Sequence, residues 1–138
     1  MRAILFIILL INTQLCFAQT AKLTLIIENI SIAKGNLEIG IYNDAKSFPK
    51  ENKEYKALKH LVTSEKEMLT LVLPVGEYAI AVFHDKNANR KCDRNLLRMP
   101  TEAYGFSNNV KPHFSAPDFK DAKFKLDKDK TIKIKLIH

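Results

Sequence analysis

The least ordinary chemistry in this sequence is a series of oxygen-bearing side chains that begins where an apolar stretch ends. The stretch "YAIAVFHD" is followed by alternating polar residues, and the series consists of Asp85, Asn87, Asn89 and Asp93. In a calcium loop of EF-hand type, positions 1, 3, 5 and 9 carry oxygen ligands and position 7 supplies a backbone carbonyl, a place that Lys91 takes here. The spacing therefore predicts a calcium site.

The series departs from an EF-hand loop in ways that weaken the predicted site. Arg90 stands where Gly is usual, and Leu96 stands where a bidentate Glu is usual, so Glu102 would have to fold back as the replacement ligand. Neighbouring Lys and Arg side chains oppose a cation, which predicts an affinity of only about 0.1–1 mM. Asp and Asn also form turns by bonding their own backbone, so a hydrogen-bonded network without an ion is the alternative.

Catalytic groups are poorly represented, and we expect no enzyme. His84 could pair with Asp85 or Glu102 in a hydrolase, but adjacent strand residues point to opposite faces. Ser107 lacks the G-x-S-x-G frame of a nucleophile elbow. Cys92 lies among basic residues that favour a thiolate, but it has no recognisable catalytic partner and is expected to be an incidental exposed thiol.

Most of the chain alternates apolar and polar residues, which predicts about seven strands. They are expected within residues 22–30, 36–43, 58–63, 68–74, 77–85, 122–127 and 131–138. The first two should form one hairpin through "AKGN" and the last two another through "DKDK". The fold class predicted is all-β: a single antiparallel β-sandwich with immunoglobulin-like or transthyretin-like packing and one long ordered loop. Tyr78, after a Pro-Val-Gly turn, either bonds back across the sandwich corner or simply packs in the core.

The long loop, residues 85–118, contains three prolines, and Phe106, Phe114 and Phe119 are expected to pin it to the strands.

The first eighteen residues are predicted to be a signal peptide. Arg2 precedes an apolar run that is too short to span a bilayer, and small residues lead to cleavage after Ala18. Lipidation at Cys16 is disfavoured because bulky Phe17 follows it. One domain, residues 19–138, would then be exported to the periplasm or outside the cell.

The charge and cysteine content narrow the choice of partners. The chain has 22 Lys and Arg against 15 Asp and Glu, a net charge of +7, and losing the leader with its one Arg would leave +6. The lysines alternate with apolar residues, as on the solvent face of a strand, so we do not expect nucleic-acid binding. Cys92 would be alone after cleavage, so no internal disulfide is expected. No later segment reaches membrane-spanning length, and a monomer is expected.

Several stretches resemble the domain of unknown function 2141 family of exported bacterial proteins. The resemblance rests on "KGNLEIGIYN", "SFP", "PVGEYAIAVFHDKNAN", Asp93, "PTEAYGFSNN" and "APDFKDAKF", and covers residues 22–137. Family members often carry Gly where Arg90 and Arg98 stand here. The family has no established activity, so the resemblance implies a fold, a location and one organised feature, formed by His84, Asp85, Asn87, Asn89, Asp93, Glu102 and residues 105–109.

The function expected is that of an exported, non-catalytic binding or envelope-structural module. Its long loop would be organised either by low-affinity calcium or by a polar network. The main alternative is a carbohydrate- or peptide-binding module whose contact surface comprises Tyr104, Phe106, Asn108 and Asn109. The partner would be an envelope protein or a glycan.

Overall fold

A computed structural model describes residues 18–138, so the predicted signal peptide lies outside the described residues except for Ala18. Eight strands make up most of the regular structure, which confirms the predicted all-β class. They are β1 (Thr20–Glu28), β2 (Asn36–Tyr42), β3 (Lys56–Leu61), β4 (Glu67–Pro74), β5 (Gly76–Asp85), β6 (Tyr104–Phe106), β7 (Phe124–Leu126) and β8 (Lys130–Lys135). A 3-10 turn (Ser107–Asn109) and the short helix α1 (Phe119–Ala122) complete the structure.

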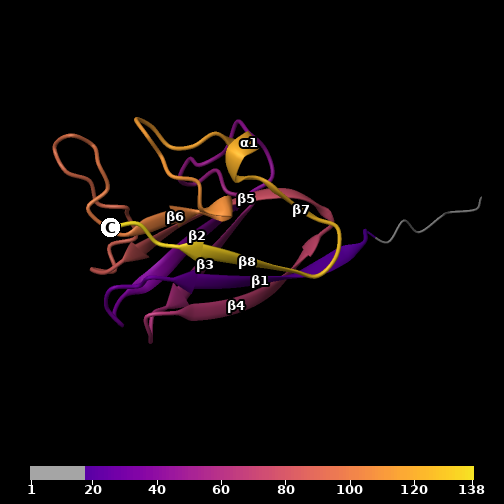
Figure 1. Ribbon diagram of the computed structural model, residues 1–138, viewed down its shortest axis with the longest axis horizontal. Coiled ribbons are helices and arrows are strands. Elements are labelled where there is room, and N and C mark those ends of the chain that lie inside the picture. The colour runs from indigo at the N-terminus through magenta and orange to yellow at the C-terminus, as the bar shows by residue number, and fades with distance from the viewer. Residues whose placement is uncertain (1–17) are drawn as a thin grey trace, which may run out of the picture.

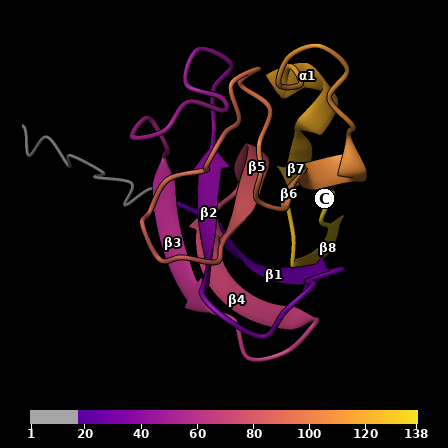
Figure 2. The ribbon, with the colours of Figure 1, turned by 90° about the vertical axis from the view of Figure 1, so that its left-hand side faces the viewer.

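The strands form two sheets, which Figures 1 and 2 show from two directions. The smaller sheet has the order β4-β1-β8, and the larger has the order β3-β2-β5-β6 with β7 also paired to β5. The strand beyond the expected seven is β6, which arises inside the predicted long loop and pairs antiparallel with residues 81–83 of β5. That loop is therefore interrupted by a short strand, which fixes its middle to the sheet.

Both predicted hairpins are wrong. β1 and β2 belong to different sheets, and so do β7 and β8. The prediction of a wholly antiparallel fold is also wrong, because β1 and β8 pair in parallel, with Leu25 opposite Ile132. Alternation shows which face of a strand is buried, but it does not show which neighbour pairs with its edge. The turn between β1 and β2 and the turn between β7 and β8 each carry the chain from one sheet to the other.

One buried core takes side chains from both sheets. Its fully buried members include Leu25 of β1, Ile39 of β2, Ile80 of β5 and Ile134 of β8. Tyr78 is buried in the same core, and its hydroxyl donates a 2.8 Å hydrogen bond to the Pro74 carbonyl. Both roles that the sequence leaves open for this tyrosine are thus realised together.

A second, smaller apolar cluster lies on the opposite face of the larger sheet. The Phe48 ring makes edge-on contacts with Tyr42, Phe106 and Phe119, with ring centroids 5.2–6.0 Å apart. These contacts hold the segments around residues 43–55 and 107–123 against the sheet, so the predicted pinning by Phe106 and Phe119 is confirmed. The prediction is wrong for Phe114, whose side chain is fully exposed at 107%.

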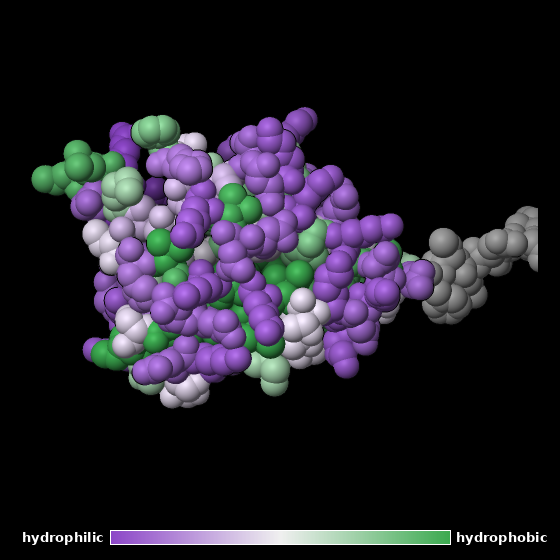
Figure 3. Space-filling model, in the orientation of Figure 1, coloured by the Kyte–Doolittle hydropathy of each residue, from purple (hydrophilic) through white to green (hydrophobic). Residues whose placement is uncertain are grey.

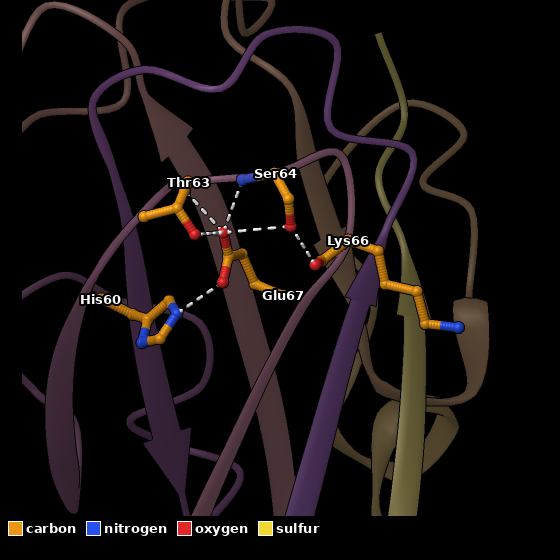
Figure 4. A network of polar contacts seen from close by, with 5 residues as sticks. All are labelled: His60, Thr63, Ser64, Lys66 and Glu67. Carbon is orange, nitrogen blue, oxygen red and sulfur yellow. Dashed lines mark hydrogen bonds and ion pairs between the residues drawn. The ribbon is translucent and has the colours of Figure 1, made fainter.

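The turn between β3 and β4 is held by a buried carboxylate (Figure 4). Glu67 accepts hydrogen bonds from the backbone N–H groups of Thr63 (2.6 Å) and Ser64 (2.8 Å), and its other oxygen lies 2.9 Å from the His60 ring. Burial by itself would raise the pKa of Glu67, but the hydrogen bonds from His60, Thr63 and Ser64 outweigh it and lower the pKa to about 2.

No helix within residues 18–138 is long and apolar enough to cross a membrane.

Candidate functional site

Asp85, the last residue of β5, anchors the segment that follows it. Its side chain is fully buried, and its two oxygens accept hydrogen bonds from the backbone N–H groups of Asn89 (3.1 Å) and Arg90 (2.8 Å). The turn before β2 packs closely on the same point: Gly35 has φ of +77°, and a Cβ there would collide with the Asp85 carbonyl oxygen. Both the side chain and the backbone of Asp85 are therefore fixed.

Glu102 closes the same segment from its far end. This buried carboxylate accepts hydrogen bonds from the backbone N–H groups of Lys86 (3.0 Å) and Asp93 (3.3 Å). The predicted calcium site would need Glu102 to fold back onto the Asp85 loop as a ligand, and in the structure Glu102 does reach this loop, as an acceptor of backbone N–H groups. It binds the loop backbone directly, which joins the beginning, the middle and the end of one excursion.

The remaining members of the series bond to one another. The side-chain amides of Asn87 and Asn89 donate to the Asp93 carboxylate at 2.6 Å and 2.9 Å. Their carbonyl oxygens accept backbone N–H groups two residues ahead, from Asn89 (3.1 Å) and Lys91 (2.8 Å). We call the side chains of Asp85, Asn87, Asn89, Asp93 and Glu102 the loop network.

The hydrogen bonds of the loop network determine which atoms could face a calcium ion. The two Asn amides direct N–H groups toward Asp93, and both would have to rotate before their oxygens could face an ion. No group of three or more His, Cys, Asp and Glu side chains within residues 18–138 is placed to hold a metal. Calcium also uses amide and carbonyl oxygens, so its binding here stays a prediction.

Two residues that replace the family's frequent glycines have an unusual backbone. Arg90 and Arg98 have φ of 63° and 61°, in the left-handed region that favours Gly. A side chain in this conformation costs roughly 1–2 kcal/mol. The loop therefore keeps a glycine-type turn at both positions, and the hydrogen bond from the Arg90 N–H to Asp85 helps to hold the first of them.

The structure separates the groups that a hydrolase would need to combine. His84 is fully buried on the core side of β5, and its Nε2 lies 2.6 Å from the Lys34 carbonyl. Within residues 18–138 no hydrogen bond joins His84 to a carboxylate, and its Nδ1 has no hydrogen-bond partner. Ser107 is also buried, where its hydroxyl accepts the Ile80 N–H (2.9 Å) and donates to the Ala122 carbonyl (2.5 Å). The side chains of His84 and Ser107 therefore both hydrogen-bond to backbone groups of neighbouring segments and hold those segments together.

The predicted contact residues after β6 divide into two groups. Asn108 donates to the carbonyls of Asp121 and Lys123, and Asn109 bonds to the backbone of β8. Their amides therefore tie the chain together. Phe106 and Tyr104 both line an open groove, where Phe106 is buried and Tyr104 is only partly buried. A contact role for these four residues stays a prediction, and Tyr104 is the one that the groove exposes.

This groove, of about 720 Å³, lies on the outer face of β3, β2 and β5, between three loops. Its floor holds small residues: Gly40 of β2 is in register with Ala57 of β3 and with Ala81 of β5. The loops that surround it contain residues 49–54, 90–100 and 112–116. Sequence reasoning missed this floor, because three small residues on separate strands become neighbours only when the register is known.

Glu38 lines the same groove and was also missed. One of its oxygens is buried without a hydrogen-bond partner and lies 3.9 Å from the Lys59 ammonium. Burial raises the pKa of Glu38, and the positive charge of Lys59 partly opposes the change. A hollow of this size, lined by apolar and aromatic side chains together with three glutamates and three arginines, is a candidate ligand site.

Comparison with known proteins gives one family match for this chain. Residues 26–135 match a bacterial family described as "Uncharacterized protein conserved in bacteria (DUF2141)". No curated protein and no solved structure matches the chain.

Proposed function

Since the chain belongs to the domain of unknown function 2141 family, whose description gives no activity, we propose a function from its geometry. The protein is an exported, non-catalytic binding module, and its groove holds a short extended peptide segment of an envelope protein. The observation that carries this proposal is the 720 Å³ groove, whose floor is sheet and whose walls are loops fixed by buried polar and aromatic contacts.

The scaffold is proposed to be a β-sandwich of immunoglobulin-like or transthyretin-like type. The single core shared by the two sheets supports this packing, as does the hydrogen bond from Tyr78 to Pro74. In such a scaffold rigid sheets position variable loops, and binding groups lie on those loops.

A peptide fits the groove better than a glycan does. β3 is the edge strand of the larger sheet, and Ala57 and Leu58 of this strand line the groove, so an extended chain can pair with β3 while its side chains enter the hollow. Glu38 lines the groove with a carboxylate that has one oxygen 3.9 Å from the Lys59 ammonium, whereas Phe83 and Tyr104 offer apolar surface. A carbohydrate on the loop face, with Tyr104 stacking on a sugar, is the second candidate.

Export and the absence of catalysis rest on separate observations. The apolar leader ending at Ala18 supports export to the periplasm or beyond. His84 is fully buried and makes no hydrogen bond to a carboxylate within residues 18–138, which supports a non-catalytic role. The loop network is proposed to position the groove wall through hydrogen bonds, with calcium as the alternative organiser.

Protein NMR with pools of short peptides and of oligosaccharides tests the proposal. We expect a peptide pool to shift the backbone amide signals of Ala57, Ala81 and Tyr104. Ala57→Phe fills the floor from an exposed strand position and should abolish the shifts, whereas Ala33→Phe, on an exposed loop outside the groove, should leave them unchanged. Binding that survives Ala57→Phe, or shifts with sugars alone, would rule out the peptide groove.

A further inference from the structure

Four large apolar side chains project into solvent at one end of the molecule. Leu96 is 104% exposed, Leu97 82%, Met99 55% and Phe114 107%. We call these four residues the loop-tip patch. They come from two segments, 95–99 and 112–116, that border the same groove. Figure 3 shows hydrophobic side chains at the end of the protruding loop on the upper left.

The tip that carries three of these residues is a structured turn. The Asn95 side-chain oxygen accepts the backbone N–H groups of Leu97 (3.0 Å) and Met99 (3.1 Å), and the Arg98 N–H bonds to the Asn95 carbonyl (2.8 Å). The base of the tip is closed by an antiparallel bridge between Arg94 and Pro100. The turn therefore holds the two leucine side chains outward. Because the loop is already ordered, less conformational entropy is lost when these side chains bind to another surface.

Cations lie near this patch. Arg90, Arg94 and Arg98 line the same groove as Leu97, Met99 and Phe114. The same two loops also carry Lys86, Lys91 and Lys111. None of them takes part in an ion pair within the part of the chain that the structure describes. Among the nearby acids, Asp85, Asp93 and Glu102 accept hydrogen bonds from loop N–H groups and Asn amides. Glu38, Glu51 and Glu54 line the same groove, and within residues 18–138 they form no ion pair with these cations. The exposed surface here thus combines protruding apolar groups with unpaired cations.

From this combination we infer that the loop-tip patch docks on a bilayer surface carrying anionic phospholipids, with Leu96, Leu97 and Phe114 inserted at the headgroup level. Protruding side chains suit a soft bilayer better than a protein pocket, and basic residues near a membrane are attracted by its negative surface potential. The inference goes beyond the groove: it concerns the outer tips of the loops, whereas the peptide site concerns the floor between them. Docking would hold the groove beside the membrane.

The chain contains no Trp, so a single introduced Trp reports on the tip alone. Leu96→Trp should show a blue-shifted emission with phosphatidylglycerol vesicles and none with phosphatidylcholine vesicles. Val72→Trp is the matched control, because Val72 is an exposed apolar residue paired with Lys22 at the start of β1, on the smaller sheet. Its emission should not change. All variants begin at residue 19, so the apolar leader takes no part in the measurement.

Vesicle co-sedimentation of residues 19–138, the form that the proposed cleavage of the leader would leave, measures affinity. Leu96→Asp should weaken binding to phosphatidylglycerol vesicles about tenfold, because it removes one inserted side chain. Arg94→Gln should weaken it about fivefold and reduce its salt dependence, and Val72→Asp should have no effect. An unshifted emission from the Leu96→Trp variant, or equal binding by Leu96→Asp and the unchanged chain, would overturn the inference. Binding that depends on salt but not on Leu96 would also overturn it, since insertion would then be absent.

Discussion

Glu102 accepts the backbone N–H of Lys86 at 3.0 Å, so the last turn before β6 holds the first residue after β5. These residues are 16 positions apart, and the carboxylate also reaches Asp93 between them. The excursion between the two strands is thereby closed on itself, although it has little regular structure. The protruding tip and one wall of the groove both depend on this closure.

The buried carboxylate of Asp85 should contribute substantially to the free energy of unfolding, because it holds the loop that follows β5. Asp85→Ala leaves the N–H groups of Asn89 and Arg90 without their acceptor, and should lower the free energy of unfolding by about 2–4 kcal/mol. Urea unfolding measures the loss. Asp127→Ala, at an exposed carboxylate with only a 3.8 Å ion pair, is the control and should cost under about 0.5 kcal/mol. Equal effects of the two variants would contradict the anchoring role of Asp85.

Calcium and the hydrogen-bonded network predict different melting behaviour. With a dissociation constant of about 1 mM, calcium at about 10 mM would stabilise the protein by about 1.4 kcal/mol, or about 5 °C in Tm. We expect no such shift, because the Asn87 and Asn89 amides direct N–H groups at Asp93. Differential scanning calorimetry with calcium and with a chelator decides the question. A rise in Tm with calcium that Asp93→Asn removes would assign the ion to the loop.

The turn between β3 and β4 should make stability depend on pH in acid. Glu67 has a pKa of about 2 in the folded protein against an ordinary value of 4.5, so its contribution is complete above pH 4.5 and is lost as the pH falls toward 2. We expect the loss to be on the order of 2 kcal/mol. Unfolding by urea across this pH range measures it.

Glu67→Gln should remove most of this pH dependence and lower stability near neutral pH. Glu65→Gln, at an exposed neighbour with no side-chain hydrogen bond within residues 18–138, should leave the profile unchanged. If Glu67→Gln retained the full acid-induced loss, the dependence would have to come from other carboxylates.

Cys92 should react slowly with alkylating agents. The expected exposed thiol is in fact only partly exposed, and burial raises its pKa to about 11, an effect that the nearby Arg94 opposes only in part. At pH 8 the thiolate fraction is therefore about a hundredfold lower than at the ordinary pKa of 9.0. Iodoacetamide labelling, followed by mass spectrometry of the Cys92 peptide, should be about a hundredfold faster in denaturing urea. Equal rates in the folded and unfolded chain would show that the thiol is free.

The all-β class, the buried face of most strands and the turns of the Asp85 series can be predicted from the sequence alone. These follow from local rules: alternation marks the inward face, and Asp and Asn spaced two apart bond to nearby backbone. The burial of Leu25, Ile39 and Ile80 and the paired bonds of Asn87 and Asn89 to Asp93 agree with those rules.

Which strands pair and where the open surface lies follow only from the assembled fold. β1 lies beside β4 and β8, and not beside β2, because contacts between distant segments choose among edges that local pattern leaves equal. For the same reason the groove floor of Gly40, Ala57 and Ala81 exists only in the assembled sheet. The exposure of Phe114 was likewise decided by packing: the Phe48 cluster is occupied by Phe106 and Phe119, and Phe114 remains in solvent.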